Sequence, residues 1–386
     1  MNWNYSESFA GIGAWGKAIK RVSERHEDTC ELKWFAEIDK YAINSFCAIH
    51  DEPESKNIVD ITKDINVEEV DVFFYSPPCQ TFSIAGKREG TDVDKGNLFY
   101  NALDKLKKSN PKYAIMENVK GLPSGDTKED FNNMIFALDD AGYFSYWKVL
   151  NSKDYGIPQN RERVFIVSIR KDIYDQGKRF EFPKEIKLEK TLFNMLEEEV
   201  DEKYYIKQEI LDKLEYELDN EKESIGDYRY DEGFRIRSND ILPCLMSSTT
   251  LNSISGSPLH INSATKKGYE VANVGDGITL DFPKSKTRRG RVGNKVSQTL
   301  TTSCNVGVYN GNTIRQITPL ESFKLQGFTE KDYNKAVENY KNTFGKKYHN
   351  QMYKQAGNSI TVNVIEEILE NLLYDRKQIG NQLSMF

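Results

Sequence analysis

The feature that most constrains this chain is the segment Ser76-Pro77-Pro78-Cys79-Gln80, which directly follows residues 70–75. Residues 70–75 are apolar, β-branched or aromatic over a short run, which predicts a buried strand. The two prolines end this strand because proline donates no hydrogen bond to a neighbouring strand. Cys79 is therefore expected at the carboxyl end of a strand, where open α/β sheets bind ligands. A cysteine there is either a nucleophile or a buried small hydrophobic residue, and this motif leaves both interpretations open.

The composition narrows the class of protein. A chain of 386 residues predicts about two or three domains. The start of the chain lacks a signal-peptide pattern and no run reaches the length of a membrane span, so we expect a cytoplasmic protein without a membrane partner. Its five cysteines and four histidines show no zinc-site spacing, so we expect no metal and no disulfide framework. The net charge of −6 does not suggest nucleic-acid binding, although binding depends on local patches.

A glycine-rich turn opens the predicted fold. Phe9-Ala10-Gly11-Ile12-Gly13 lies between a predicted strand and a predicted helix, and Gly11, Gly13 and Gly16 match the spacing GxGxxG. Glycines allow the backbone to approach a ligand, and a helix N-terminus favours a negative group. Taken alone, the pattern is more typical of an ordinary strand–helix turn.

Two carboxylates follow at the ends of the next predicted strands. Residues 32–39 predict a second strand that ends near Glu37 and Ile38, and residues 57–61 predict a third strand with Asp60 and Ile61 at its end. Ordinary acidic strand ends would give the same pattern. An acidic residue about 20 positions after a glycine turn commonly binds ribose hydroxyls. We therefore predict a nucleoside-like cofactor site, with the glycines at a carboxylate tail, Glu37 at ribose and Asp60 at an adenine amino group.

The rest of the first half adds further candidates. Residues 81–96 predict a mobile loop that closes over a substrate. A strand at residues 113–116 leads into Glu117, and a strand at 164–169 follows Arg161 and Arg163. These two arginines share one side of an extended segment because strand side chains alternate. A solvated surface pair would look the same in the sequence.

The composition changes near residue 182. Residues 184–232 are rich in charge and predict exposed helices, with no evident chemistry. Residues 284–291 form a basic run that suits phosphate and base-edge contacts, although charge runs are usually solvated faces. Near the end of the chain, Thr318 and Pro319 predict a capped helix start, and residues 357–362 lead into an amphipathic helix through residue 373.

These motifs together resemble the DNA (cytosine-5)-methyltransferase family, because they occur in family order at both ends of the chain. The matching segments are Phe9-Ala10-Gly11-Ile12-Gly13, Pro77-Pro78-Cys79-Gln80, Glu117-Asn118-Val119, Gln159-x-Arg161-x-Arg163, residues 315–328 and Gly357-Asn358-Ser359. Two departures are Ala14-Trp15, where the family more often has another glycine, and a Lys- and Tyr-rich insert between Phe328 and Gln355.

The resemblance implies an α/β fold, namely a Rossmann-like S-adenosylmethionine-dependent methyltransferase domain with a second, smaller, irregular target-recognition domain. On this view, residues 1–182 form the catalytic domain, residues 352–386 complete it, and residues 183–351 form the target-recognition domain with a hinge. The implied reaction is site-specific methylation of C5 of a flipped-out cytosine in double-stranded DNA, by a restriction–modification or an orphan bacterial or phage enzyme.

The resemblance also implies roles for individual residues. Cys79 would attack C6 of the base, Glu117 would protonate N3, and Arg161 and Arg163 would hold the base carbonyl and a phosphate. S-adenosylmethionine would contact Phe9, Ala10, Gly11, Ile12, Gly13, Glu37, Ile38, Asp60, Ile61, Pro78, Leu98, Asn358 and Ser359. DNA would contact Gln80, Ser83, Lys87, Arg88, Arg288, Arg289, Arg291, Thr299 and Leu300. We expect a monomer, with any cognate restriction endonuclease on a separate chain.

Three alternatives differ in their predictions. An amino-group methyltransferase carries an aromatic residue after its two prolines, and Cys79 argues against that class. A transfer-RNA cytosine-5 methyltransferase would use the same catalytic domain. A catalytically inactive DNA-binding homologue would not need Cys79, Glu117 and Arg161, all of which are present.

Overall fold

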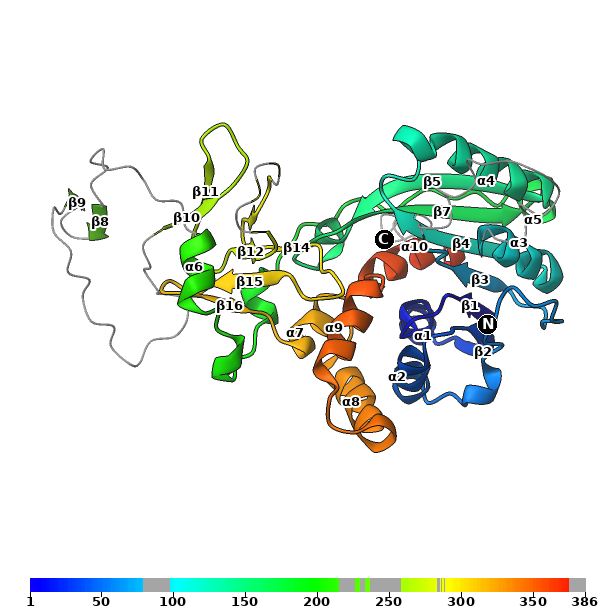
Figure 1. Cartoon of the computed structure of the whole chain (residues 1–386). Helices are drawn as coiled ribbons and strands as arrows, with labels where there is room; N and C mark the ends of the chain where they lie inside the picture. Colours follow the sequence, from blue (N-terminus) through cyan, green and yellow to red (C-terminus); the bar gives the residue numbers. More distant parts are fainter. Residues whose placement is uncertain are drawn as a thin grey trace, which may run out of the picture. The chain divides into compact units, whose positions relative to one another are not determined.

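The computed structural model describes residues 1–78, 98–214, 226–229, 233–236, 258–282, 285, 287 and 289–374 (Figure 1). The chain forms two compact units. The first comprises Met1–Lys190, Leu300–Ser303 and Pro319–Phe386, and the second comprises Thr191–Thr299 and Cys304–Thr318.

The first unit contains most of the regular structure. Its strands are β1 (Asn2–Ser8), β2 (Thr29–Ala36), β3 (Val72–Tyr75), β4 (Tyr113–Val119), β5 (Tyr143–Asn151), β6 (Gln159–Asn160) and β7 (Glu162–Arg170). Its helices are α1 (Ala14–Arg25), α2 (Lys40–His50), α3 (Leu98–Ser109), α4 (Lys128–Asp140), α5 (Lys171–Asp175), α7 (Pro319–Lys324), α8 (Glu330–Phe344), α9 (His349–Asn358) and α10 (Val362–Leu373).

A six-stranded sheet in the order β2-β1-β3-β4-β7-β5 forms the centre of this unit. Strands β2, β1, β3 and β4 are parallel to one another, whereas β7 is antiparallel to both β4 and β5. The carboxyl ends of the four parallel strands consequently meet at one edge of the sheet. This confirms the predicted α/β class and the edge at which a ligand site was expected.

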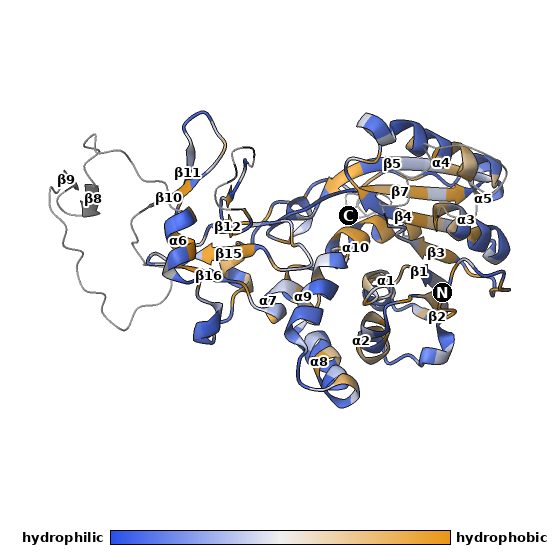
Figure 2. Ribbon diagram, in the orientation of Figure 1, coloured by the Kyte–Doolittle hydropathy of each residue, from blue (hydrophilic) through white to orange (hydrophobic). Residues whose placement is uncertain are grey.

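Helices cover both faces of the sheet because the side chains of each strand alternate. In β3, Phe73 and Tyr75 join a cluster that includes residues of α3 and α4, whereas Val72 and Phe74 join a cluster that includes α1 and α10. Figure 2 shows hydrophobic residues along β4, β7 and α10. The strand predicted at residues 70–75 forms at Val72–Tyr75 and is buried on both faces, as the apolar run of these four residues indicates.

The Lys- and Tyr-rich insert extends the first unit. Helix α8 packs on α2, where Tyr41 and Tyr340 have ring centroids 5.6 Å apart. Lys17 Nζ lies 2.7 Å from Asp332 Oδ1, and Asn339 donates a hydrogen bond to the carbonyl of Asn44. Residues 319–351, expected in the second domain, therefore lie with the first unit, because α7 and α8 bury their apolar faces there.

Two other sequence predictions were wrong. Residues 57–61 form no strand: Asn57 makes an isolated bridge to Phe35, Val59 has a φ of 58°, and Asp60 accepts a hydrogen bond from the amide of Thr62, which turns the chain. Residues 184–214 are mostly irregular, and the α-helix within them is the short α6 (Gln208–Leu214). The predicted helix starting at Pro319 and the one ending at Leu373 are confirmed.

The second unit is built from short strands: β8 (Gly226–Arg229), β9 (Gly233–Ile236), β10 (Leu259–Asn262), β11 (Tyr269–Ala272), β12 (Gly277–Thr279), β13 (Val292–Gly293), β14 (Ser297–Gln298), β15 (Val306–Tyr309) and β16 (Ile314–Gln316). Strands β13-β12-β15-β16 form a four-stranded antiparallel sheet. Its core includes Ile278 and Ile314 together with Leu211 and Leu214 of α6. Among the described residues, no helix has both the length and the apolar character needed to cross a bilayer.

Candidate active site

The glycine turn between β1 and α1 is held by its neighbours. Gly11 and Gly13 have φ values of 56° and 80°, in the left-handed region that favours glycine. A Cβ on Gly13 would lie 2.1 Å from Nε2 of His50, so this residue must be glycine to pack. His50 Nε2 lies 3.1 Å from the carbonyl of Ile12, and since a carbonyl only accepts, this nitrogen carries the proton. Burial lowers the pKa of His50 to about 3, which keeps the ring neutral.

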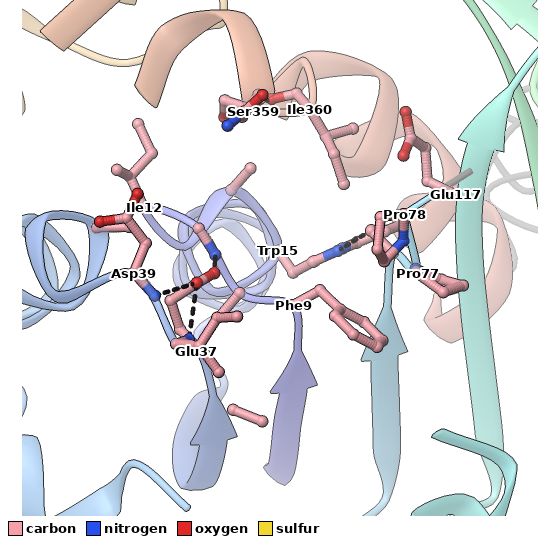
Figure 3. Close-up of a pocket in the computed structure, with 18 of the residues that line it drawn as sticks. Phe9, Ile12, Trp15, Glu37, Asp39, Pro77, Pro78, Glu117, Ser359 and Ile360 are labelled. Atoms are coloured by element: carbon pink, nitrogen blue, oxygen red, sulfur yellow. Dashed lines mark hydrogen bonds between the residues drawn. The ribbon is translucent and has the colours of Figure 1, made fainter. Parts of the chain in front are cut away.

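Glu37 fixes the same turn from the end of β2. Its Oε2 accepts a hydrogen bond of 2.8 Å from the amide of Gly11, and its Oε1 accepts from the amides of Ile38 and Asp39, each at 2.8 Å (Figure 3). A carboxylate has about four lone-pair sites, so capacity for a further donor remains. The predicted ribose residue thus also joins the second strand to the glycine turn.

A cavity of about 570 Å³ opens at the carboxyl ends of β1–β4. This volume falls in the range of small-molecule sites. The predicted cofactor residues that line it are Phe9, Ala10, Gly11, Ile12, Glu37, Ile38, Asp60, Ile61, Pro78, Leu98, Asn358 and Ser359. Gly13, the remaining predicted cofactor residue, packs against His50 and is not among the lining residues.

Sequence reasoning missed several wall residues. Asp39 and Lys354 both line the cavity and form an ion pair with Nζ 2.7 Å from Oδ2. Burial raises the pKa of Asp39, but the bonds from Lys354 and the amide of Tyr41 outweigh it, and the net pKa is lowered. Ile360 lines the cavity opposite the strand ends (Figure 3). These residues come from segments far apart in the chain, so no local pattern marks them.

One wall of the cavity is apolar and open. Ile38 is 76% exposed and Val59 is 48% exposed, although both are large aliphatic residues. Beside them, Asp60 accepts hydrogen bonds from both the hydroxyl and the amide of Thr62, which lower its pKa. Exposed aliphatic side chains next to an ionised carboxylate suit a flat apolar ring that carries a polar amino group.

The proline segment is fixed from two sides. Trp15 Nε1 donates to Ser76 Oγ at 3.2 Å, and Asn118 Nδ2 donates to the carbonyl of Pro77 at 2.8 Å. The chain is therefore held in place up to Pro78. Cys79 lies outside the described residues, as do the loop 81–96 and the predicted DNA contacts Gln80, Ser83, Lys87, Arg88 and Arg288.

Buried Glu117 and half-buried Arg163 form an ion pair at the edge of the cavity. They lie on the adjacent strands β4 and β7, with Glu117 opposite Phe165 and Val119 opposite Arg163 in register. Arg163 Nε lies 3.1 Å from Glu117 Oε1. Burial raises the pKa of Glu117, and the charges of Arg163 and Arg161 reduce this rise without cancelling it. A carboxyl group with a raised pKa keeps its proton to a higher pH than an exposed one, as a general acid requires.

Arg161 differs from Arg163 in its contacts. Its side chain is buried, and its Nη atoms donate to the backbone carbonyls of Leu300, Gly357 and Ser359. The two arginines therefore make different contacts. Arg163 contacts Glu117, whereas Arg161 donates to backbone carbonyls.

The residues near and within the second unit that were predicted to contact DNA differ in their exposure to solvent. Arg291 is completely buried and donates to the carbonyls of Thr279, Asp281 and Phe282, so its guanidinium supports a loop and does not face solvent. Arg289 is exposed and donates from Nε to the carbonyl of Ala264. Thr299 is half-buried, and Leu300, in the first unit, is buried.

Comparison with known proteins identifies the family. The family model for C-5 cytosine-specific DNA methylase matches residues 4–374. The chain belongs to this family. Two relatives of this methylase are the orphan methyltransferase M.SPRI of Bacillus phage SPR, 32% identical over 95% of this chain and 96% of the relative, and the type II methyltransferase M2.ScrFI of Lactococcus lactis subsp. cremoris, 28% identical over 95% of this chain and 98% of the relative.

Solved structures agree on the fold of this methylase. S. pombe Dnmt2 methyltransferase matches with a TM-score of 0.56 and 16% identity, covering 97% of this chain and 99% of that one. The Entamoeba histolytica methyltransferase EhMeth matches with a TM-score of 0.55 and 16% identity, covering 97% and 99%. Family and fold are those of S-adenosylmethionine-dependent methyltransferases. The cavity suits S-adenosylmethionine, because it combines backbone amides at a glycine turn, two carboxylates and an apolar wall.

Proposed function

We propose that this protein methylates C5 of a cytosine in double-stranded DNA through a transient covalent bond between Cys79 and C6 of the base. The observation that carries the proposal is the ion pair of buried Glu117 with half-buried Arg163 at the mouth of a cofactor-sized cavity, next to the fixed end of the Pro77-Pro78 segment. The thiolate, the acid and the cavity would then converge on one base.

The chemistry explains why a cysteine is needed. C5 of cytosine is a poor nucleophile, so the Cys79 thiolate first adds to C6 and pushes electron density toward C5. Glu117 donates its proton to N3 during this addition, and its raised pKa keeps that proton available. When bound, S-adenosylmethionine supplies an activated methyl group for C5. A base then removes the C5 proton, Cys79 leaves as a thiolate, and Glu117 recovers its proton from N3.

Arg163 supports both states of Glu117. Its Nε contact holds the carboxyl group in one orientation, and its charge favours the carboxylate that remains after proton donation. Its Nη1 donates to the carbonyl of Glu162, and Nη2 is suited to the base carbonyl. Arg161 also lines the cavity, and its Nη atoms hold the backbone carbonyls of Gly357 and Ser359.

The cofactor roles follow the walls of the cavity. Glu37 would accept from the ribose hydroxyls, Asp60 from the adenine amino group, and Ile38 would cover the adenine ring. Open space beside Gly11, where an added Cβ would meet no atom within 4 Å, suits the carboxylate tail. Glu37→Ala should weaken cofactor binding more than DNA binding, and calorimetry with each ligand compares the two effects.

The DNA must present its target base outside the helix, since C6 is not accessible in a stacked pair. We infer that the loop 81–96 closes behind the flipped base and that the second unit reads neighbouring bases, with Arg289 as an exposed candidate. We also infer that the protein is a cytoplasmic monomer of an orphan or restriction–modification system, and that any endonuclease is a separate chain.

The deciding experiment is bisulfite sequencing of unmethylated plasmid after incubation with the protein and S-adenosylmethionine. Cys79→Ser is the test variant, and Cys47→Ser is the matched control because Cys47 lies in α2 away from the cavity wall. Protected cytosines at one short recurring sequence are expected for the parent and the control but not for Cys79→Ser. Full activity of Cys79→Ser would exclude the nucleophile. Methylation of transfer RNA with none of DNA would favour the RNA enzyme, and no methylation of either would favour an inactive homologue.

A further inference from the structure

We propose that Arg161 is a positioning residue that couples the cofactor cavity to Leu300–Ser303, the segment through which the chain leaves and re-enters the second unit. This inference rests on the proposed cofactor site. It assigns to Arg161 a task different from that of Arg163, even though the two residues are adjacent on one side of the same extended segment.

The contacts of Arg161 join three separate parts of the first unit. Nη1 donates to the carbonyl of Leu300 at 3.4 Å. Nη2 donates to the carbonyls of Gly357 at 3.2 Å and Ser359 at 2.7 Å. The side chain is only 3% exposed, so these bonds form in a protected environment. Arg161 thus ties the segment at Leu300 to the end of α9.

A second contact brings the same two segments together. An added Cβ on Gly357 would lie 2.5 Å from the carbonyl oxygen of Thr301. Only glycine allows the end of α9 to approach this segment so closely. The hydrogen bonds of Arg161 therefore hold the two segments together, and the absence of a side chain at Gly357 allows them to approach.

The helix end explains why a buried charge is stable here. Helix α9 ends at Asn358, and its last carbonyls carry partial negative charge that favours a cation. The planar guanidinium presents its donors in fixed directions toward several carbonyls, whereas a lysine ammonium is a point charge on a flexible stem. The substitution Arg161→Lys is therefore expected to keep the positive charge and to lose some of the hydrogen bonds to the backbone carbonyls.

The same helix end forms a wall of the cavity. Gly357, Asn358, Ser359 and Ile360 line the cavity, and α10 begins two residues later at Val362. A ligand that contacts Asn358 and Ser359 will restrain the carbonyls that Arg161 holds, and with them the segment at Leu300. Coupling between two such sites is reciprocal, so loosening the segment at Leu300 must weaken the binding of the ligand.

The test compares Arg161→Lys with Arg291→Lys. Arg291 is the matched control because it is an equally buried arginine that donates to three backbone carbonyls, but it belongs to the second unit and does not line the cavity. Calorimetry with S-adenosylhomocysteine, without DNA, measures the affinity. Hydrogen exchange of peptides spanning residues 300–303, with and without S-adenosylhomocysteine, measures the coupling.

For the parent protein, S-adenosylhomocysteine should slow exchange at residues 300–303. Arg161→Lys should bind it about tenfold more weakly, which corresponds to about 1.4 kcal/mol, and should lose this protection. Arg291→Lys should retain both the affinity and the protection while its melting temperature falls.

Four outcomes would overturn the inference. One is parent-like affinity together with parent-like protection in Arg161→Lys, and another is equal loss of both in Arg291→Lys. If the parent itself does not bind S-adenosylhomocysteine, the proposed cofactor site fails, and this inference fails with it. If Arg161→Lys does not fold by circular dichroism, Gly357→Ala displaces Thr301 from the opposite side, and unchanged protection in that variant would refute the coupling.

Discussion

Glu7→Gln should stabilise this protein in a strongly pH-dependent manner. Glu7 lies in β1, completely buried, beside the backbone of Gly16 in α1. Neither carboxylate oxygen has a hydrogen-bond partner of good geometry among the described residues. Burial raises the pKa of Glu7 to about 8, Glu52 adds to the rise, and Gly16 and Lys20 reduce it.

The magnitude follows from the difference between the folded and unfolded states. A carboxyl group with a raised folded pKa binds its proton more tightly when folded, so its stabilising contribution is complete below about pH 4.5 and is lost as pH rises to about 8. With about 1.36 kcal/mol per pH unit, the loss is about 4 kcal/mol at pH 8 and about 1 kcal/mol at pH 5. Glutamine has nearly the same shape and stays neutral, so the variant escapes this loss.

Urea unfolding at pH 5 and pH 8 measures the effect as a free energy of unfolding. We expect Glu7→Gln to exceed the parent by a few kcal/mol at pH 8 and by much less at pH 5. Glu69→Gln, at an exposed position, is the control and should change stability by less than about 0.5 kcal/mol at either pH. A Glu7→Gln variant that is less stable than the parent at pH 8, or equally affected at both pH values, would refute the argument.

Glu117→Gln should lower the methylation rate by about 10²–10⁴-fold and leave the affinity for S-adenosylhomocysteine unchanged. Because the pKa of Glu117 is raised, the parent should lose activity as rising pH deprotonates Glu117, and the variant's pH–rate profile should lack this decline. Gly13→Ala should lower the free energy of unfolding by about 1–3 kcal/mol, because the added methyl group forces His50 aside, and should weaken the binding of S-adenosylhomocysteine. An unchanged melting temperature would contradict this. Glu366→Ala, which removes the ion pairs with the partly exposed Arg21 and Arg25, should cost about 1 kcal/mol, and 1 M salt should shrink the difference in urea unfolding.

The local sequence determined several elements of the first unit and its family. Residues 72–75 are apolar on both faces and are followed, after Ser76, by two prolines, so they favour a short buried strand that stops at Tyr75, and β3 is that strand. Pro319 began a helix where its fixed φ and missing amide are tolerated. Motifs of this kind are local, and their order along the chain was sufficient to identify a cytosine-5 methylase.

Only the tertiary structure decided what individual residues do. Arg161 and Arg163 look equivalent in sequence, yet one holds carbonyls from residues 300, 357 and 359 while the other contacts Glu117. Arg291 belongs to a basic run, but it is buried and supports a loop. The direction of a long side chain depends on which distant segments leave polar backbone groups to satisfy, and no local pattern records those partners.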